Sequence, residues 1–91
     1  MSSLTYSERF LTWMTIEQGR SPRTIEAYRR DLVRYEAFLE TSNLDVLSAQ
    51  SPNIEQFIAS LRAEGKAAKS VARMYAAVRM MHRYLVEERL R

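Results

Sequence analysis

Basic side chains gather toward the carboxyl end of the chain. Residues 1–65 carry seven Lys or Arg and nine Asp or Glu, whereas residues 66–91 carry seven basic and two acidic residues. Between residues 66 and 86 there are five cations and no carboxylate. Such side chains neutralise phosphates, and Arg also bonds the edge of guanine. The distribution favours a polyanionic partner, with an ordinary solvated helix face as the alternative reading.

Catalytic and metal-binding chemistry finds little support in the sequence. The chain has no Cys and one His, which excludes a disulfide, a thiolate metal site, a Cys nucleophile and a His cluster. It has no Gly-rich phosphate loop, no paired catalytic carboxylates and no metal-ligand spacing. The five tyrosines fall mostly at core spacing, and His82 lies at the edge of an apolar face. We therefore expect neither an active site nor a cofactor within these residues.

Length and hydropathy predict one small domain spanning residues 1–91. Hydrophobic residues make up 46% of the chain and charged residues 27%, as in an ordinary globular protein. No apolar run approaches the ~20 residues that span a bilayer, and the first residues lack the pattern of a signal peptide. We expect a cytoplasmic, monomeric domain with no membrane partner.

Helical periodicity recurs four times, and no stretch alternates as a strand would. The expected helices cover about residues 3–18, 22–40, 52–64 and 67–88. Ser-Pro pairs at 21–22 and 51–52 predict helix starts, with the Ser as cap, and Gly19 and Gly65 follow helix ends. The connection at 41–50 should fold back onto the core through its apolar residues. The sequence thus predicts an all-α, compact bundle of four helices without a sheet.

Two of these helices carry basic residues opposite their apolar sides. On the fourth helix the apolar stripe includes Val71, Met74 and Val78, at steps of three and four. Within each helix the basic ridge contains no acidic residue, so we expect both ridges to contact nucleic acid. The alternative for the second helix is an ordinary surface helix with i,i+4 pairs, since Glu26, Glu36 and Glu40 lie on an adjacent face near Arg29. The candidate DNA-binding residues are Arg23, Thr24, Ala27, Arg30 and Arg34 on the second helix, and Lys66, Lys69, Ser70, Arg73, Arg79 and Arg83 on or just before the fourth.

Two segments resemble the core-binding domain of the tyrosine recombinases, the phage-integrase and Xer-type enzymes. The first is Arg20-Ser21-Pro22-Arg23-Thr24-Ile25-Glu26-Ala27-Tyr28-Arg29-Arg30-Asp31-Leu32, and its second half is most similar to the Xer branch. The second is Lys69-Ser70-Val71-Ala72-Arg73, continuing to Tyr84-Leu85. The ordered set covers about residues 10–89. Met81 and His82 depart from the aromatic residues that the family often has there.

The resemblance implies a SAM-like four-helix unit that covers one face of duplex DNA at a recombination site. In the family the second and fourth helices lie in the major groove. Arg23, Thr24 and Ala27 match contact positions on the second helix, and Lys69, Ser70 and Arg73 match those on the fourth.

A separate carboxy-terminal domain holds the catalytic residues in that family, and other recombinase protomers are its partners. The resemblance therefore implies a non-catalytic part of an enzyme, with the catalytic domain absent from these residues. A helical protein-interaction module that binds an acidic partner is the alternative function.

Overall fold

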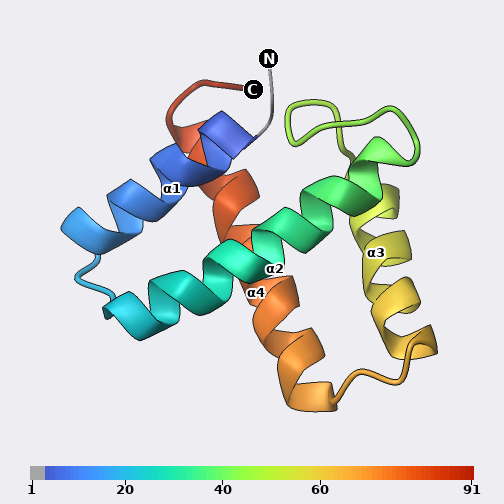
Figure 1. The fold of residues 1–91 in the computed structure, drawn as a ribbon. Helices are drawn as coiled ribbons and strands as arrows, with labels where there is room; N and C mark the ends of the chain where they lie inside the picture. Colours follow the sequence, from blue (N-terminus) through green and yellow to red (C-terminus); the bar gives the residue numbers. More distant parts are fainter. Residues whose placement is uncertain (1–3) are drawn as a thin grey trace.

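The computed structural model describes residues 4–91, which form four helices and no strand (Figure 1). The helices are α1 (Leu4–Ile16), α2 (Pro22–Glu40), α3 (Ser51–Ala63) and α4 (Ala68–Glu87). The all-α, sheet-free bundle is confirmed. The bounds of α2 coincide with those expected, and the other helices differ by one or two residues at their ends. The expected start of the first helix, at residue 3, lies outside the described residues.

Capping chemistry sets the starts of α2 and α3 in different ways. The backbone of Ser21 is extended, its hydroxyl accepts the Thr24 N–H at 3.2 Å, and Pro22 occupies the first helical position, as predicted. The expected cap of α3 was wrong by one residue. Gln50 is the cap and Ser51 is already helical, because the Asn53 side-chain oxygen accepts the Gln50 N–H at 2.7 Å.

A left-handed residue closes the end of α3. Gly65 has φ +82°, which lets the Lys66 N–H reach the Leu61 carbonyl at 3.2 Å and the Gly65 N–H reach Arg62 at 3.0 Å. This is the paired hydrogen bonding of a Schellman motif. The same pattern follows α2 and α4, where Asn43 and Arg89 each have φ 57°. These turns satisfy the last carbonyls of three helices and reverse the chain sharply.

The core lies where α2 crosses α4, with α1 and α3 on opposite sides of α4 (Figure 1). As predicted, the 41–50 connection folds inward: Val46 is fully buried, and Leu44 and Leu47 are partly buried. Ala77 and Tyr84 of α4 are buried as well, beyond the stripe identified from the sequence. The buried side chains of all four helices form one cluster. This packing fixes the angle between α2 and α4, and with it the relative placement of the two basic ridges.

No helix within residues 4–91 combines the length and apolarity needed to cross a bilayer.

Candidate nucleic-acid interface

A shallow groove of about 440 Å³ separates α2 from the start of α4. Five of the eleven candidate residues line it: Arg30, Arg34, Lys66, Ser70 and Arg73. Apolar and small side chains of α2 and α4 form part of its floor and walls. The crossing of the two helices therefore brings together cations that lie more than thirty positions apart in the sequence.

Arg73 is held in this groove by a carboxylate from the other helix. Its Nε donates to Asp31 Oδ2 at 2.9 Å, and its Nη2 donates to Asp31 Oδ1 at 2.8 Å. The Asp31 side chain is 3% exposed, whereas that of Arg73 is 42% exposed. The two hydrogen bonds from Arg73 to Asp31 raise the pKa of Arg73 above its usual value. Arg73 thus joins α4 to α2 while its side chain remains in contact with solvent.

Arg34 also has an acidic partner, but an exposed one. Its guanidinium pairs with Glu64, the residue that caps the end of α3. Both side chains are nearly half exposed. The two ridges are free of acids along each helix, as the sequence indicates, but not in space. Asp31 and Glu64 reach them from neighbouring turns and elements, so the groove is less positive than the count of its cations suggests.

Arg79 and Arg83 lie apart from this groove. They line a second depression, of about 270 Å³, between α3 and α4, together with Glu55, Tyr75 and His82. The Arg79 guanidinium lies 5.5 Å from the centre of the Tyr75 ring, within the range of a cation–π contact. The structure therefore divides the cations of α4 between two surfaces.

The remaining candidates lie outside the α2–α4 groove. Arg23 and Lys69 are exposed, and Ala27 is half-buried. Thr24 takes part in the cap of α2, where its Oγ1 accepts a hydrogen bond from the Ser21 hydroxyl at 3.0 Å. Together these residues place polar and basic groups at the amino ends of α2 and α4, where exposed N–H groups favour anions.

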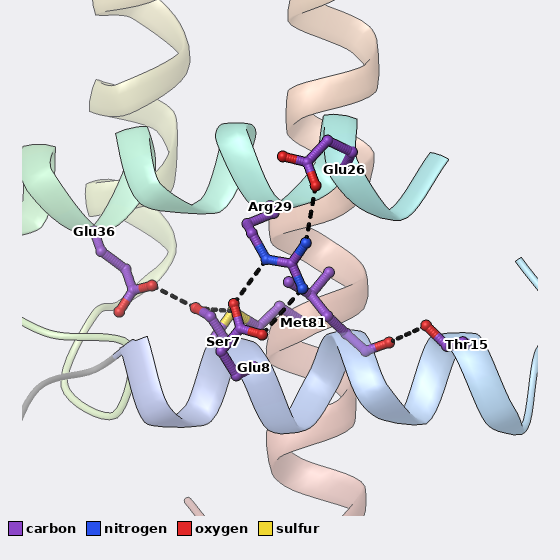
Figure 2. A network of polar contacts seen from close by, with 8 residues as sticks. Ser7, Glu8, Thr15, Glu26, Arg29, Glu36 and Met81 are labelled. Carbon is purple, nitrogen blue, oxygen red and sulfur yellow. Dashed lines mark hydrogen bonds and ion pairs between the residues drawn. The ribbon is translucent and has the colours of Figure 1, made fainter. Parts of the chain in front are cut away.

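Arg29 does not line the groove and points toward α1 (Figure 2). It donates two hydrogen bonds to Glu8 and one to Glu26, at 2.9 to 3.1 Å. These contacts raise the pKa of Arg29 and lower that of Glu8. Glu36, which the sequence placed on the same exposed face, is instead buried and accepts the Ser7 hydroxyl (Figure 2). Arg29 is therefore a cation of the α1–α2 contact.

His82, which the sequence places at the edge of an apolar face, is partly buried and makes a polar contact with the core residue Tyr35. Its Nε2 lies 2.7 Å from the Tyr35 hydroxyl, and its Nδ1 lies 3.4 Å from Arg91 Nη1. Burial, and to a lesser degree the charge of Arg91, lowers the pKa of His82 to about 4. Among the residues that the structure describes, no group of three acidic, His or Cys side chains could hold a metal ion.

The sequence did not identify Asp31 and Glu64 as members of the site. Asp31 offers a weak signal, because it lies on α2 between the basic ridge and the apolar stripe, where a buried carboxylate needs a cation. Glu64 offers none, since its contact with Arg34 depends on how α3 ends. Both contacts join residues at least thirty positions apart.

The structure is thus an all-α domain of four helices, with basic residues on the exposed sides of α2 and α4. The family model described as the phage integrase, N-terminal SAM-like domain, matches residues 7–89. The chain belongs to this family, the N-terminal domains of tyrosine recombinases.

Curated relatives share this assignment. The chain is 37% identical over 82 residues to the tyrosine recombinase XerD of Bradyrhizobium diazoefficiens, covering 90% of this chain and 26% of that protein. It is 38% identical over 88 residues to the tyrosine recombinase XerD of Staphylococcus saprophyticus, covering 93% of this chain and 29% of that protein. The chain thus spans between a quarter and a third of the length of these relatives. No solved structure matches it significantly.

Proposed function

We propose that this domain binds duplex DNA through α2 and α4 and positions it for a tyrosine recombinase. The family supports DNA as the partner, and the groove supports where the DNA lies. Arg30, Lys66 and Ser70 supply donors beside Arg73, and Lys69 extends the positive surface at the start of α4. Contacts of this kind go mainly to phosphates and fix the register of a protein on DNA.

Catalysis belongs, in this proposal, to residues beyond the four helices. Cleavage and rejoining of DNA need a nucleophile surrounded by groups that stabilise the charge of the transition state. Tyr35 and Tyr84 are buried in the core, where their hydroxyls cannot reach a phosphate of bound DNA. The domain therefore acts as one part of a clamp on the duplex, in the cytoplasm and together with other recombinase protomers, and is monomeric by itself.

The observation that carries the proposal is the convergence of five predicted contact residues on one groove. The crossing of α2 and α4 places donors from both ridges within reach of one extended polyanion. The second surface, with Arg79 and Arg83, is a further candidate contact on the same helix.

Titration of the ¹⁵N-labelled domain with a random-sequence duplex tests the proposal. We expect amide shifts in α2, in residues 64–73 and along the exposed side of α4, and their loss at high salt. Perturbation confined to α1 and the 41–50 connection would contradict it and favour the rival function, a helical module that binds an acidic protein.

A further inference from the structure

Asp31 occupies one edge of the Arg73 guanidinium and leaves another open. The bonds from Nε and Nη2 use the side edge of the planar group. A guanidinium has a second two-donor edge, formed by Nη1 and Nη2. Within residues 4–91 no acceptor bonds Nη1, and Arg73 lines the groove. The open edge is therefore available to a ligand with two acceptor atoms.

Burial of a carboxylate is costly unless a cation and hydrogen bonds compensate it, and Arg73 supplies both to Asp31. Burial of Asp31 removes it from water, and its charge offsets that of the cation beside it. A groove built only to attract phosphate by charge would leave Arg73 unpaired, as the structure leaves Lys66 and Lys69 without an ion-pair partner among the described residues. Electrostatic attraction alone thus gives no reason for Asp31.

We infer that Asp31 is a positioning residue, which fixes the Arg73 guanidinium so that its Nη1–Nη2 edge meets a pair of acceptor oxygens or nitrogens on duplex DNA. Two phosphate oxygens, or O6 and N7 of guanine, have this chemistry. The inference rests on the proposed function of the groove. Because Asp31 restricts the Arg73 rotamers in the free protein, binding loses less side-chain entropy.

The contrast with Arg34 supports this assignment. Both arginines pair with a carboxylate, yet Glu64 is 48% exposed and Asp31 is 3% exposed. An exposed pair on two long side chains exchanges easily with water or with a phosphate. A buried, doubly bonded pair persists. The groove thus contains one arginine that is held in place and one that is free to leave its partner.

A double-mutant cycle with Asp31→Asn and Arg73→Lys separates positioning from charge. The Asn keeps the shape of Asp31 but loses the second carboxylate oxygen and its charge. The Lys keeps the positive charge of Arg73 but lacks the planar fork. Affinity for a random-sequence duplex is measured by fluorescence anisotropy for the wild type, both single variants and the double variant, each first shown by thermal unfolding to be folded.

We expect Asp31→Asn to weaken duplex binding about threefold or more in the Arg73 protein, by releasing the rotamers of Arg73. In the Arg73→Lys background the same change should leave binding equal or stronger, since a negative charge is removed and no fork remains to be oriented. An equal strengthening in both backgrounds would overturn the inference, because Asp31 would then act only as a repelling charge.

The Arg73 Nε–Hε signal provides a second readout on the unmodified protein, which holds even if a variant fails to fold. We expect a slowly exchanging signal whose shift changes little when duplex is added, because Nε stays bonded to Asp31. Loss of that signal on DNA binding would overturn the inference.

A duplex of A·T pairs compared with one rich in G·C distinguishes the two possible ligands of the Nη1–Nη2 edge. Equal effects of Asp31→Asn on the two duplexes indicate phosphate, and a larger effect on the G·C duplex indicates guanine.

Failure of the proposed function has a different signature from failure of this inference. If Lys66→Ala with Lys69→Ala leaves duplex binding unchanged, the groove does not bind DNA. If that pair weakens binding while the Asp31 cycle shows no coupling, the groove binds DNA and only the positioning role is lost.

Discussion

Burial separates the two acidic residues of the groove at the scale of single side chains. Asp31 is enclosed between α2 and α4 and holds Arg73 through two bonds. Glu64 is about half exposed at the end of α3, where it pairs with Arg34. An exposed pair contributes little to folding, typically below about 1 kcal/mol. If the groove binds DNA as proposed, we expect Glu64 to act mainly as a local negative charge that competes with phosphate for Arg34.

Glu64→Gln should strengthen duplex binding about two- to fivefold at low salt, because it frees Arg34 and removes a repelling charge. The free energy of unfolding should change by less than about 0.5 kcal/mol. Affinity titrations and urea unfolding measure the two effects. Glu40→Gln is the matched control, since Glu40 is an exposed carboxylate at the far end of α2. Equal gains in both variants would show that net charge alone is responsible.

His82 links the core to the end of the described chain. It contacts Tyr35 of α2 and Arg91, and Arg91 also donates to the Val46 carbonyl at 2.8 Å. Glu55, Arg79 and the other residues of the neighbouring depression surround its exposed edge. A protonated ring would direct a second N–H and a positive charge toward the Arg91 guanidinium. The neutral ring is therefore the form that the fold favours.

Stability should fall as the pH drops from about 6.5 toward 4 through the titration of His82. Its pKa is lowered from 6.5 to about 4 in the folded state, so the unfolded chain binds more protons in that window. The stability that neutral His82 contributes is complete above pH 6.5, its pKa in the unfolded chain. Below about pH 4, its pKa in the folded state, the loss of stability reaches at most about 3 kcal/mol. Urea unfolding between pH 4 and 7 measures it. His82→Gln should show a flatter profile over this range, and an identical profile would contradict the assignment.

The turn between α3 and α4 matters at the scale of elements, because it sets the positions of Glu64 and Lys66. Gly65 adopts φ +82° there, and a Cβ added to it would meet no atom within 4 Å. The demand for Gly thus comes from the backbone conformation and not from crowding.

Gly65→Ala should destabilise the domain by about 1 kcal/mol, the cost of placing an L-residue in the left-handed region. Gly65→Asn should lose less, because Asn tolerates this conformation better. Chemical unfolding of the three proteins gives the comparison. Equal stability of the Ala variant and the wild type would show that the turn relaxes to a different conformation.

The elements were largely predictable from the sequence, because the signals that define them are local. The apolar spacing of Leu32, Tyr35 and Leu39 and the Ser21-Pro22 start depend only on neighbours along the chain. The prediction that Ser51 caps α3 was wrong, because the Asn53 side chain accepts the backbone N–H of Gln50 and makes Gln50 the cap. Burial of Tyr84 depends on the aromatic rings of α1, Phe10 and Trp13, at 5.7 and 5.4 Å, which no pattern within α4 reveals.

The site was predictable only in part. Its cations follow from helical spacing, so Arg30, Arg34 and Arg73 lie on exposed sides of their helices as expected. Their acidic partners do not follow from it, because Asp31 and Glu64 meet them through the crossing angle of α2 and α4 and the turn after α3. The role of each candidate in binding DNA remains a prediction.

The whole molecule carries a formal charge of only +3, so its attraction to DNA depends on where the cations lie. A duplex bound in the groove would meet Lys66 and Arg30 in it and Lys69 beside it, none of them paired with a carboxylate among the described residues. A few phosphate contacts give weak binding that falls steeply with salt. The isolated domain should therefore bind duplex weakly.

The salt dependence of duplex binding tests the central claim most directly. The logarithm of the association constant is plotted against the logarithm of salt concentration for the wild type, for Lys66→Ala with Lys69→Ala, and for Arg9→Ala with Arg89→Ala. The last pair removes the same charge from exposed positions outside both the groove and the start of α4. Loss of the two lysines should reduce the slope by about 1.8, at about 0.9 per phosphate contact, whereas loss of the control pair should change the slope little. Equal slopes for the two double variants would contradict the claim that this surface binds DNA.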